Sequence, residues 1–298
     1  MGVAMKLNRR RLMLSGLAIC AFAWTAFNAL PAFAAEPSRI VTIGGSLTEI
    51  VYALEEEDRL IARDTTSLFP EAAAKLPDVG YIRQLSPEGV LSVNPDMIIA
   101  LDGFGPPEAA SVIRHAGIPV VVVPDGYDSS SIVEKIRATA EALGRREAGD
   151  RLIESVEAKL AVVSAAAEGI ADKKKVLFLL TAQDGRLMAS GSDTHADGII
   201  ALAGGVNAMS GFTGYKPVSN EAVIEAAPDV ILRMRNGRDP SSDAEVLANP
   251  AISATPAGKA GSVVGMDGLY LLGFGPRTAD AAHELSKMLY SDEPAPGN

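Results

Sequence analysis

The chain has 298 residues, a formal charge of -10 at pH 7 and 48% hydrophobic residues, which is enough for two domains with a sizeable core. The first 34 residues hold four basic side chains and no acidic one, so the rest of the chain carries a net charge of -14. Because phosphate binding depends on clustered lysines and arginines, this balance argues against a nucleic-acid partner. The single cysteine, Cys20, lies in the N-terminal stretch, which leaves the rest of the chain without disulfides or a cysteine nucleophile.

The N-terminus has the pattern of a secretory signal peptide. A basic stretch at residues 6–11 precedes an apolar run at residues 12–30, and Ala32–Ala34 fits the small-x-small cleavage rule. A membrane anchor is the alternative, since the apolar run is almost long enough to span a bilayer, but the cleavage pattern and Pro31 favour removal. Three consecutive arginines also fit a twin-arginine signal. We therefore expect residues 1–34 to direct export by the general secretory or the twin-arginine route.

The first half of the exported chain alternates strands with helices. Apolar and β-branched runs predict strands at residues 39–43, 60–63, 97–101 and 118–123, the last of them buried, and helices at residues 46–54, 87–93, 107–116 and 131–143. Ser46–Glu49 has the spacing of a capping box at the start of its helix. This alternation predicts a parallel α/β layer with binding sites at the carboxyl ends of the strands.

A long helix is predicted over residues 145–168. The segment contains no proline, and Leu152, Val156, Leu160 and Val163 recur at helical spacing. At 1.5 Å per residue, a helix of about 22 residues would run roughly 33 Å. That length suits a helix joining two lobes, and an ordinary packed helix within one domain is the alternative.

The second half repeats the α/β pattern. Strands are predicted at residues 176–180, 230–232 and 262–266, with one helix ending at Leu202 and a terminal helix at residues 278–289. We therefore expect an N-terminal lobe at residues 35–145, an interlobe helix at residues 146–170 and a C-terminal lobe at residues 171–298.

An internal repeat supports two lobes of related build. The pattern S-x-E-x-V followed by P-D-x-I occupies Ser86–Ile98 and recurs with the same spacing over Ser219–Ile231, 133 residues later. A tyrosine precedes each copy, Tyr81 in the first and Tyr215 in the second. We expect the lobes to face each other, with one glutamate of the repeat on each lobe.

No arrangement typical of a hydrolase or of a multi-histidine metal site is present in the sequence. There is no G-x-S-x-G motif, and His115, His195 and His283 are far apart, without the H-E-x-x-H spacing. His195 is expected where a helix begins just beyond a strand end, where ligands usually approach. A role in a cleft and a solvated helix terminus both remain open for His195.

One long string resembles a known family. The string G-Y-x-R-x-L-S-x-E-G-V-L-S over Gly80–Ser92, followed by Asn94–Asp96, is similar to the haem-binding members of the periplasmic substrate-binding proteins of ABC importers. Gly103–Pro107, Gly214–Ala222 and Leu271–Arg277 also resemble that group, so the likeness covers essentially the whole exported chain. The wider family includes vitamin B12 and ferric-siderophore binders and shares the repeat, whereas the Gly-Tyr-x-Arg string is what points to haem.

The resemblance implies a fold and a ligand site. It implies two Rossmann-like α/β lobes joined by a single long rigid helix, with the ligand in the cleft between them. It also implies that Tyr81 ligates the haem iron with support from Arg83. Ferric iron suits a phenolate oxygen, and a nearby cation favours the phenolate form. Pairing of Arg83 with a haem propionate is an alternative role, and an aromatic packed at a lobe edge is the alternative for Tyr81.

The second axial position is left open. Some members of the family carry a histidine at the end of the second lobe's first strand, but residues 181–184 contain none. Five-coordinate haem, or water or Tyr215 on the open face, therefore remain alternatives, and the stoichiometry is one haem or two. His195 lies near this place in the sequence and is a further candidate to support haem binding.

The resemblance also implies partners. Glu88 and Glu221 would dock onto arginines of the membrane permease, and stabilisation of their own helices is the alternative role. We expect a periplasmic monomer that captures ferric haem and delivers it to an ABC permease and its ATPase, downstream of an outer-membrane haem receptor. The alternatives are a vitamin B12 or siderophore carrier and, more distantly, a secreted α/β enzyme.

Overall fold

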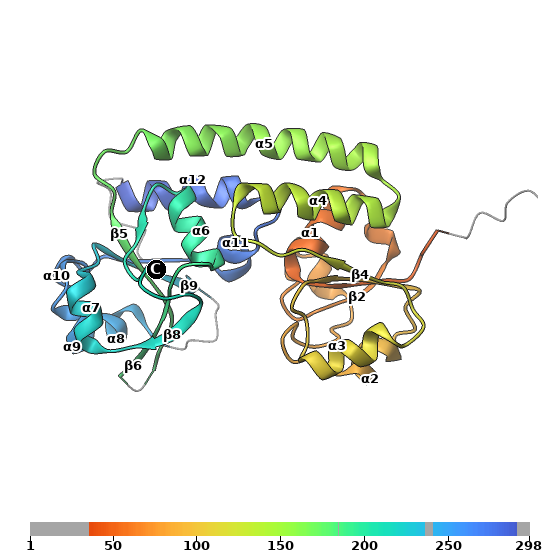
Figure 1. Ribbon diagram of the computed structural model, residues 1–298, viewed down its shortest axis with the longest axis horizontal. Helices are drawn as coiled ribbons and strands as arrows, with labels where there is room; N and C mark the ends of the chain where they lie inside the picture. Colours follow the sequence, from red (N-terminus) through yellow and green to blue (C-terminus); the bar gives the residue numbers. More distant parts are fainter. Residues whose placement is uncertain (1–35, 184, 236–240, 291–298) are drawn as a thin grey trace, which may run out of the picture. The chain divides into compact units, whose positions relative to one another are not determined.

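The computed structural model describes residues 36–183, 185–235 and 241–290. The signal peptide expected at residues 1–34 and the last eight residues lie outside this part of the chain. Across the described residues, no helix combines the length and the apolar character needed to cross a membrane. The described chain forms two β-sheets with helices packed on both (Figure 1).

The first sheet is parallel, as predicted. Its strands are β1 (Ile40–Ile43), β2 (Leu60–Arg63), β3 (Met97–Leu101) and β4 (Val120–Val123), in the order β2-β1-β3-β4. The expectation of a buried strand at residues 118–123 is wrong in part. Strand β4 starts at Val120 and only Val123 is buried, because β4 lies at the edge of the sheet, where one side has no neighbouring strand.

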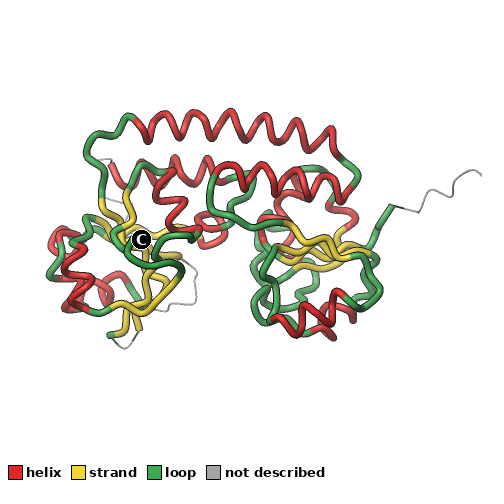
Figure 2. The backbone as a smooth tube through the Cα atoms, viewed as in Figure 1, coloured by secondary structure: helices red, strands yellow, loops and turns green. Residues whose placement is uncertain are grey.

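Four helices cover this sheet. They are α1 (Gly45–Ala53), α2 (Pro87–Ser92), α3 (Pro107–Arg114) and α4 (Ser129–Leu143). Figures 1 and 2 show α1 and α4 on one face and α2 and α3 on the other. The predicted capping box at Ser46–Glu49 is wrong, because α1 starts at Gly45 with Gly44 as its N-cap and both Ser46 and Glu49 are buried inside the helix.

The second sheet is mixed rather than purely parallel. Its strands are β5 (Lys175–Gln183), β6 (Arg186–Ser190), β7 (Val206–Asn207), β8 (Tyr215–Val218), β9 (Val230–Arg235) and β10 (Val263–Asp267). The main order is β10-β9-β5-β6-β8, and β5–β6 and β6–β8 pair antiparallel. Strand β5 extends past its predicted end at Leu180, and the short connection to β6 permits only antiparallel pairing.

Two helical groups flank the second sheet. One group comprises α6 (His195–Leu202), α11 (Gly268–Leu272) and α12 (Thr278–Tyr290), and the other comprises α7 (Asn220–Ala226), α8 (Asp243–Ala248), α9 (Pro250–Ser253) and α10 (Pro256–Ala260). The predicted long helix is confirmed as α5 (Arg146–Glu168). It packs along α4 and α12, and so contacts helices that flank both sheets (Figure 1).

One hydrophobic core serves both sheets. It runs from the first sheet through α4, α5, α6 and α12 to one face of the second sheet, and a smaller core fills the opposite face of the second sheet. Strand β5 divides its side chains between them, with Val176 and Phe178 in the larger core and Leu177 and Leu179 in the smaller. Adjacent strand residues point to opposite faces, which explains why this strand is a continuous apolar run.

The internal repeat has a structural counterpart. In the first copy, Asp96 accepts hydrogen bonds from the backbone N–H of Ser38 and Arg39, just before β1. In the second copy, Asp229 accepts one from the backbone N–H of Lys175, at the start of β5, at 2.8 Å. Asp96 thus links the start of β3 to the start of β1, and Asp229 links the start of β9 to the start of β5.

Candidate functional site

Tyr81 and Arg83 lie on one loop that leads into α2. Tyr81 is partly buried against the larger core, and Gln84 N–H donates to the Tyr81 carbonyl at 2.7 Å to close a turn. The loop is fixed to the segment after β3 by two backbone hydrogen bonds, from Leu85 to Gly105 at 2.8 Å and from Gly105 to Ile82 at 2.9 Å. The sequence neighbours of Tyr81 are therefore held in place by the segment that follows β3.

Arg83 is exposed at this loop, but a hydrogen bond restrains its side chain. Its Nη1 donates to the Gly103 carbonyl at 2.5 Å. Gly103 has a φ of +72°, and a Cβ there would lie 2.6 Å from Nη1 of Arg83. The glycine is needed both for this backbone conformation and for the close approach of the guanidinium.

His195, the first residue of α6, contacts residues that follow β4. Its Nε2 lies 3.1 Å from Oδ1 of Asp125, and its ring makes edge contacts with Tyr127 and Phe274 at centroid distances of 5.9 and 5.1 Å. The His195 side chain is 22% exposed. Its imidazole is thus oriented by a carboxylate and two aromatic rings rather than projecting from a solvated helix end.

Asp125 also pairs with a buried lysine that the sequence did not single out. Nζ of Lys135 lies 2.9 Å from Oδ1 of Asp125 and 3.5 Å from the Gly273 carbonyl, and the lysine side chain is 0% exposed. Burial alone would raise the pKa of Asp125, but the hydrogen bond from His195 and the charge of Lys135 outweigh it and hold that pKa well below its ordinary value.

Contact with Asp125 acts to raise the pKa of Lys135, whereas burial acts to lower it. Burial lowers the pKa of Lys135, and the charge of Asp125 offsets only part of this effect. We take the charged pair as the resident state, because Asp125 has two donors and the ammonium has two acceptors within reach.

Tyr215 begins β8 and is mostly enclosed. Its ring contacts Phe178 edge to face at 6.2 Å, and it packs against the larger core. Burial raises the pKa of Tyr215, and hydrogen bonds with the Ala196 backbone and the Thr194 side chain offset this only in part. The phenol is therefore held in its protonated form at neutral pH.

Glu88 and Glu221 occupy matching places, as the repeat predicts. Each lies in the first turn of its helix and is exposed, and the helices are capped by Ser86 and Ser219. Hydrogen bonds from its own backbone N–H and from Ser219 lower the pKa of Glu221. Both carboxylates therefore face solvent at a helix N-terminus, where negative charge is favoured.

A second buried ion pair was missed by sequence reasoning. Arg277 donates to both carboxylate oxygens of Glu49, at 2.9 and 2.5 Å, and its guanidinium stacks over the rings of Phe69 and Tyr270 at 3.5 and 4.9 Å. Burial raises the pKa of Glu49, and Arg277 offsets this only in part. The partners are 228 residues apart, so only the similarity of Leu271–Arg277 to the family string could have drawn attention to this place.

Known structures resemble this chain over most of its length. It is 39% identical to the periplasmic haem-binding protein BhuT in complex with two haems, covering 84% of this chain and 97% of that one with a TM-score of 0.78. It is 38% identical to the periplasmic haem-binding protein RhuT from Roseiflexus sp. RS-1 in its apo form, covering 85% and 98% with a TM-score of 0.81.

Two relatives known from sequence are more distant. An uncharacterised ABC transporter substrate-binding lipoprotein of Bacillus subtilis, YvrC, is 27% identical over 86% of this chain and 81% of its own length. The vitamin B12-binding protein of Vibrio campbellii is 26% identical over 66% and 71%. Residues 40–269 match the periplasmic binding protein family, and the chain therefore belongs to that family.

Proposed function

We propose that this protein captures ferric haem in the periplasm and delivers it to the permease and ATPase of an ABC importer, without catalysing a reaction. The observation that carries the proposal is the Gly-Tyr-x-Arg loop at residues 80–83, held against Gly103 by Arg83. Solved haem-binding proteins at 38–39% identity support haem as the ligand.

Tyr81 is the proposed iron ligand. Its phenol oxygen is a suitable donor for ferric iron, and its loop is fixed by backbone hydrogen bonds that would hold the ring when the ligand enters. Arg83 has five N–H donors in all, and only its Nη1 donates to Gly103. The guanidinium can therefore support the phenolate or pair with a haem propionate.

The architecture we infer for binding has two lobes, at residues 35–145 and 171–298, joined by a rigid helix at residues 146–170. The two sheets and the position of α5 against α4 and α12 support this division. Haem would lie between the lobes, with Tyr215 and His195 supporting it from the second lobe. Because His195 is oriented by Asp125, we assign it a positioning role rather than iron ligation.

The proposed partners follow from the same function. Glu88 and Glu221 would each meet an arginine of the permease, and their exposure at helix N-termini supports that role. The remaining expectations are a monomer in the periplasm after removal of residues 1–34, no nucleic-acid partner, and an outer-membrane haem receptor upstream.

Haem titration followed by visible absorption tests the proposal. Tyr81→Phe removes the oxygen but keeps the ring, so the fold should survive while haem binds at least tenfold more weakly and the ferric-phenolate band disappears. Tyr52→Phe, at another partly buried tyrosine that packs on the core, is the matched control and should bind haem like the wild type. An unchanged spectrum in Tyr81→Phe would remove Tyr81 as the ligand.

Vitamin B12 is the second candidate ligand, favoured by relatives such as the Vibrio campbellii protein. The same titration with cyanocobalamin separates the two. Saturable binding of cyanocobalamin with no specific haem band would assign the chain to that group instead.

A further inference from the structure

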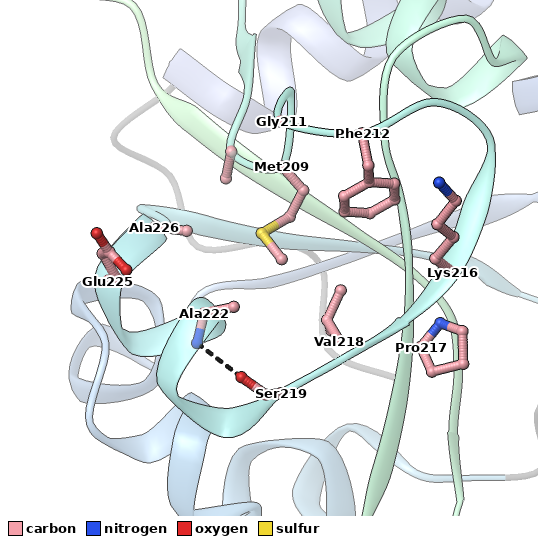
Figure 3. Close-up of a pocket in the computed structure, with 11 residues that line it drawn as sticks. Met209, Gly211, Phe212, Lys216, Pro217, Val218, Ser219, Ala222, Glu225 and Ala226 are labelled. Carbon is pink, nitrogen blue, oxygen red and sulfur yellow. Dashed lines mark hydrogen bonds between the residues drawn. The ribbon is translucent and has the colours of Figure 1, made fainter.

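A pocket of about 460 Å³ opens beside α7 (Figure 3), and none of the residues proposed to bind haem lines it. Met209, Phe212 and Val218 form its apolar wall, and Ala222 and Ala226 of α7 form another. In Figure 3 the ammonium group of Lys216 and the carboxylate of Glu225 lie toward opposite ends of this cluster. The pocket is therefore apolar inside, with one charge of each sign at its edge.

Strand β8 separates this pocket from the proposed haem site. Tyr215 packs on the larger core, whereas Phe212 and Val218 pack on the smaller core, at the other face of the second sheet. Lys216 follows Tyr215 directly, and successive side chains of a strand point to opposite faces. A ligand in this pocket would thus occupy a different face of the sheet from Tyr215.

The pocket adjoins the carboxylate proposed to meet the permease. Ser219 lines the pocket and also caps α7 through the Ala222 N–H, at 3.2 Å (Figure 3). Glu221 is in the first turn of that helix, and Glu225 follows it by four residues, about one helical turn of roughly 5.4 Å. A partner whose cation reaches Glu221 therefore comes within one helical turn of the opening.

We propose that this pocket receives a large apolar side chain from a periplasmic segment of the ABC permease, next to the arginine that pairs with Glu221. The inference rests on the proposed transport function. The two acidic side chains on α7 fit a cationic segment, whereas Lys216 lies toward the other end of the pocket, over the Phe212 ring. The pocket fits the apolar residue beside the cation. Glu221 steers and orients the complex, and the pocket supplies the affinity.

The expected effects on affinity favour an ion pair that orients the complex and an apolar anchor that holds it. An exposed ion pair changes an equilibrium constant by about fivefold or less, so the glutamates alone would hold a permease weakly. An apolar anchor buried in a pocket at the centre of an interface changes it by roughly 30-fold or more when it is lost. A stable complex thus needs an anchor, and this pocket lies beside the proposed ionic contact.

Filling the pocket tests the proposal. Ala222→Gln places a long polar side chain at its wall, and Ala226→Leu is a second variant that fills the same space. The matched control is Ile224→Gln, because Ile224 is 47% exposed on the same helix and does not line the pocket. The measurement is equilibrium binding of each haem-loaded variant to the permease–ATPase complex that takes up haem from the wild type, held in lipid nanodiscs.

We expect Ala222→Gln and Ala226→Leu to bind the permease complex roughly 30-fold more weakly, with haem affinity within about twofold of wild type. Ile224→Gln should bind it within about fivefold of wild type. If both filled variants bind the permease complex within about fivefold of wild type, the proposal is overturned. This holds even if Glu221→Ala weakens docking, as the transport function requires. Failure of the wild type to bind haem or any permease would overturn the transport function together with it.

A second occupant is tested in the same experiment. Sedimentation of the free protein should show a monomer that Ala222→Gln leaves unchanged. A concentration-dependent dimer that Ala222→Gln dissolves would assign the pocket to a second copy of this chain and overturn the proposal.

Discussion

Replacing Asp125 by asparagine should destabilise the fold more than any change at an exposed ion pair. The substitution leaves Lys135, which is 0% exposed, without its counter-charge at 2.9 Å and weakens the contact with His195. Breaking one partner of a buried pair costs roughly 3–5 kcal/mol. Asparagine keeps a carbonyl oxygen for the ammonium, so we expect about 3 kcal/mol, or a fall in Tm of roughly 6–12 °C for a chain of this size.

Urea and thermal unfolding followed by circular dichroism measure this loss. Glu141→Gln is the matched control, because Glu141 pairs with Arg146 at 3.1 Å where the two side chains are 48% and 73% exposed. That variant should change the free energy of unfolding by less than about 1 kcal/mol. Adding Lys135→Met to Asp125→Asn should recover part of the loss, because it removes the stranded charge. If Asp125→Asn costs no more than Glu141→Gln, the charged pair does not stabilise the fold.

The same pair predicts how stability depends on pH. The pKa of Asp125 in the folded protein lies below its unfolded value of about 3.9. A carboxyl shifted in this direction contributes stability that is fully present above its unfolded pKa and is lost as the pH falls through its folded pKa. The difference in unfolding free energy between the wild type and Asp125→Asn should therefore narrow below about pH 4. A constant difference down to pH 2 would contradict the assigned charge state.

Three further variants test the loop, the docking residues and the core. Gly103→Ala should weaken haem binding, because the new Cβ would displace the Arg83 guanidinium, and should also lower the stability of the fold, because alanine is strained at a φ of +72°; a haem titration equal to wild type would contradict the first expectation. Glu88→Ala combined with Glu221→Ala should keep full haem binding, since both side chains are exposed, and should abolish haem uptake into liposomes that contain the importer, since the two carboxylates orient the protein on the permease; normal uptake would leave them only a helix-stabilising role. Phe178→Ala should cost about 3–5 kcal/mol by urea unfolding, because this side chain is 0% exposed in the larger core.

Much of the fold follows from local signals in the sequence. Strand β3 was predicted with its observed bounds, and α4 ends at Leu143 as predicted, just before Gly144, whose φ of +72° is the left-handed conformation typical of a helix end. The repeat was visible as matching residues at matching spacing, whereas the hydrogen bonds that Asp96 and Asp229 accept from Arg39 and Lys175 span 57 and 54 residues and appear only in the structure. The strand and the helix end depend on a few adjacent residues, so the sequence alone predicts them.

The errors arise where tertiary contacts override local patterns. Ser46–Glu49 has the letters of a capping box, but Glu49 is drawn into the interior by Arg277 and the helix begins earlier. The antiparallel β5–β6 pair was missed, although Asp184-Gly185 is a typical hairpin signal, because the alternating strands and helices favoured a parallel sheet throughout. The network of Lys135, Asp125 and His195 spans 70 residues of sequence, so no local pattern reveals it.

The buried polar contacts bear on how a ligand would be captured. His195 with Asp125, Lys135 with Gly273 and Arg277 with Glu49 each join a residue near the second sheet to one near the first. Separating the sheets would strand a fully buried lysine and a buried carboxylate and would also open a continuous hydrophobic core. Leaving such groups without partners costs several kcal/mol each. A ligand could separate the sheets only if it bound the separated form more tightly than the packed form by at least that free energy. We therefore expect haem to enter a largely preformed site. We also expect loss of Asp125 to lower the stability of the fold without changing which ligand the protein binds.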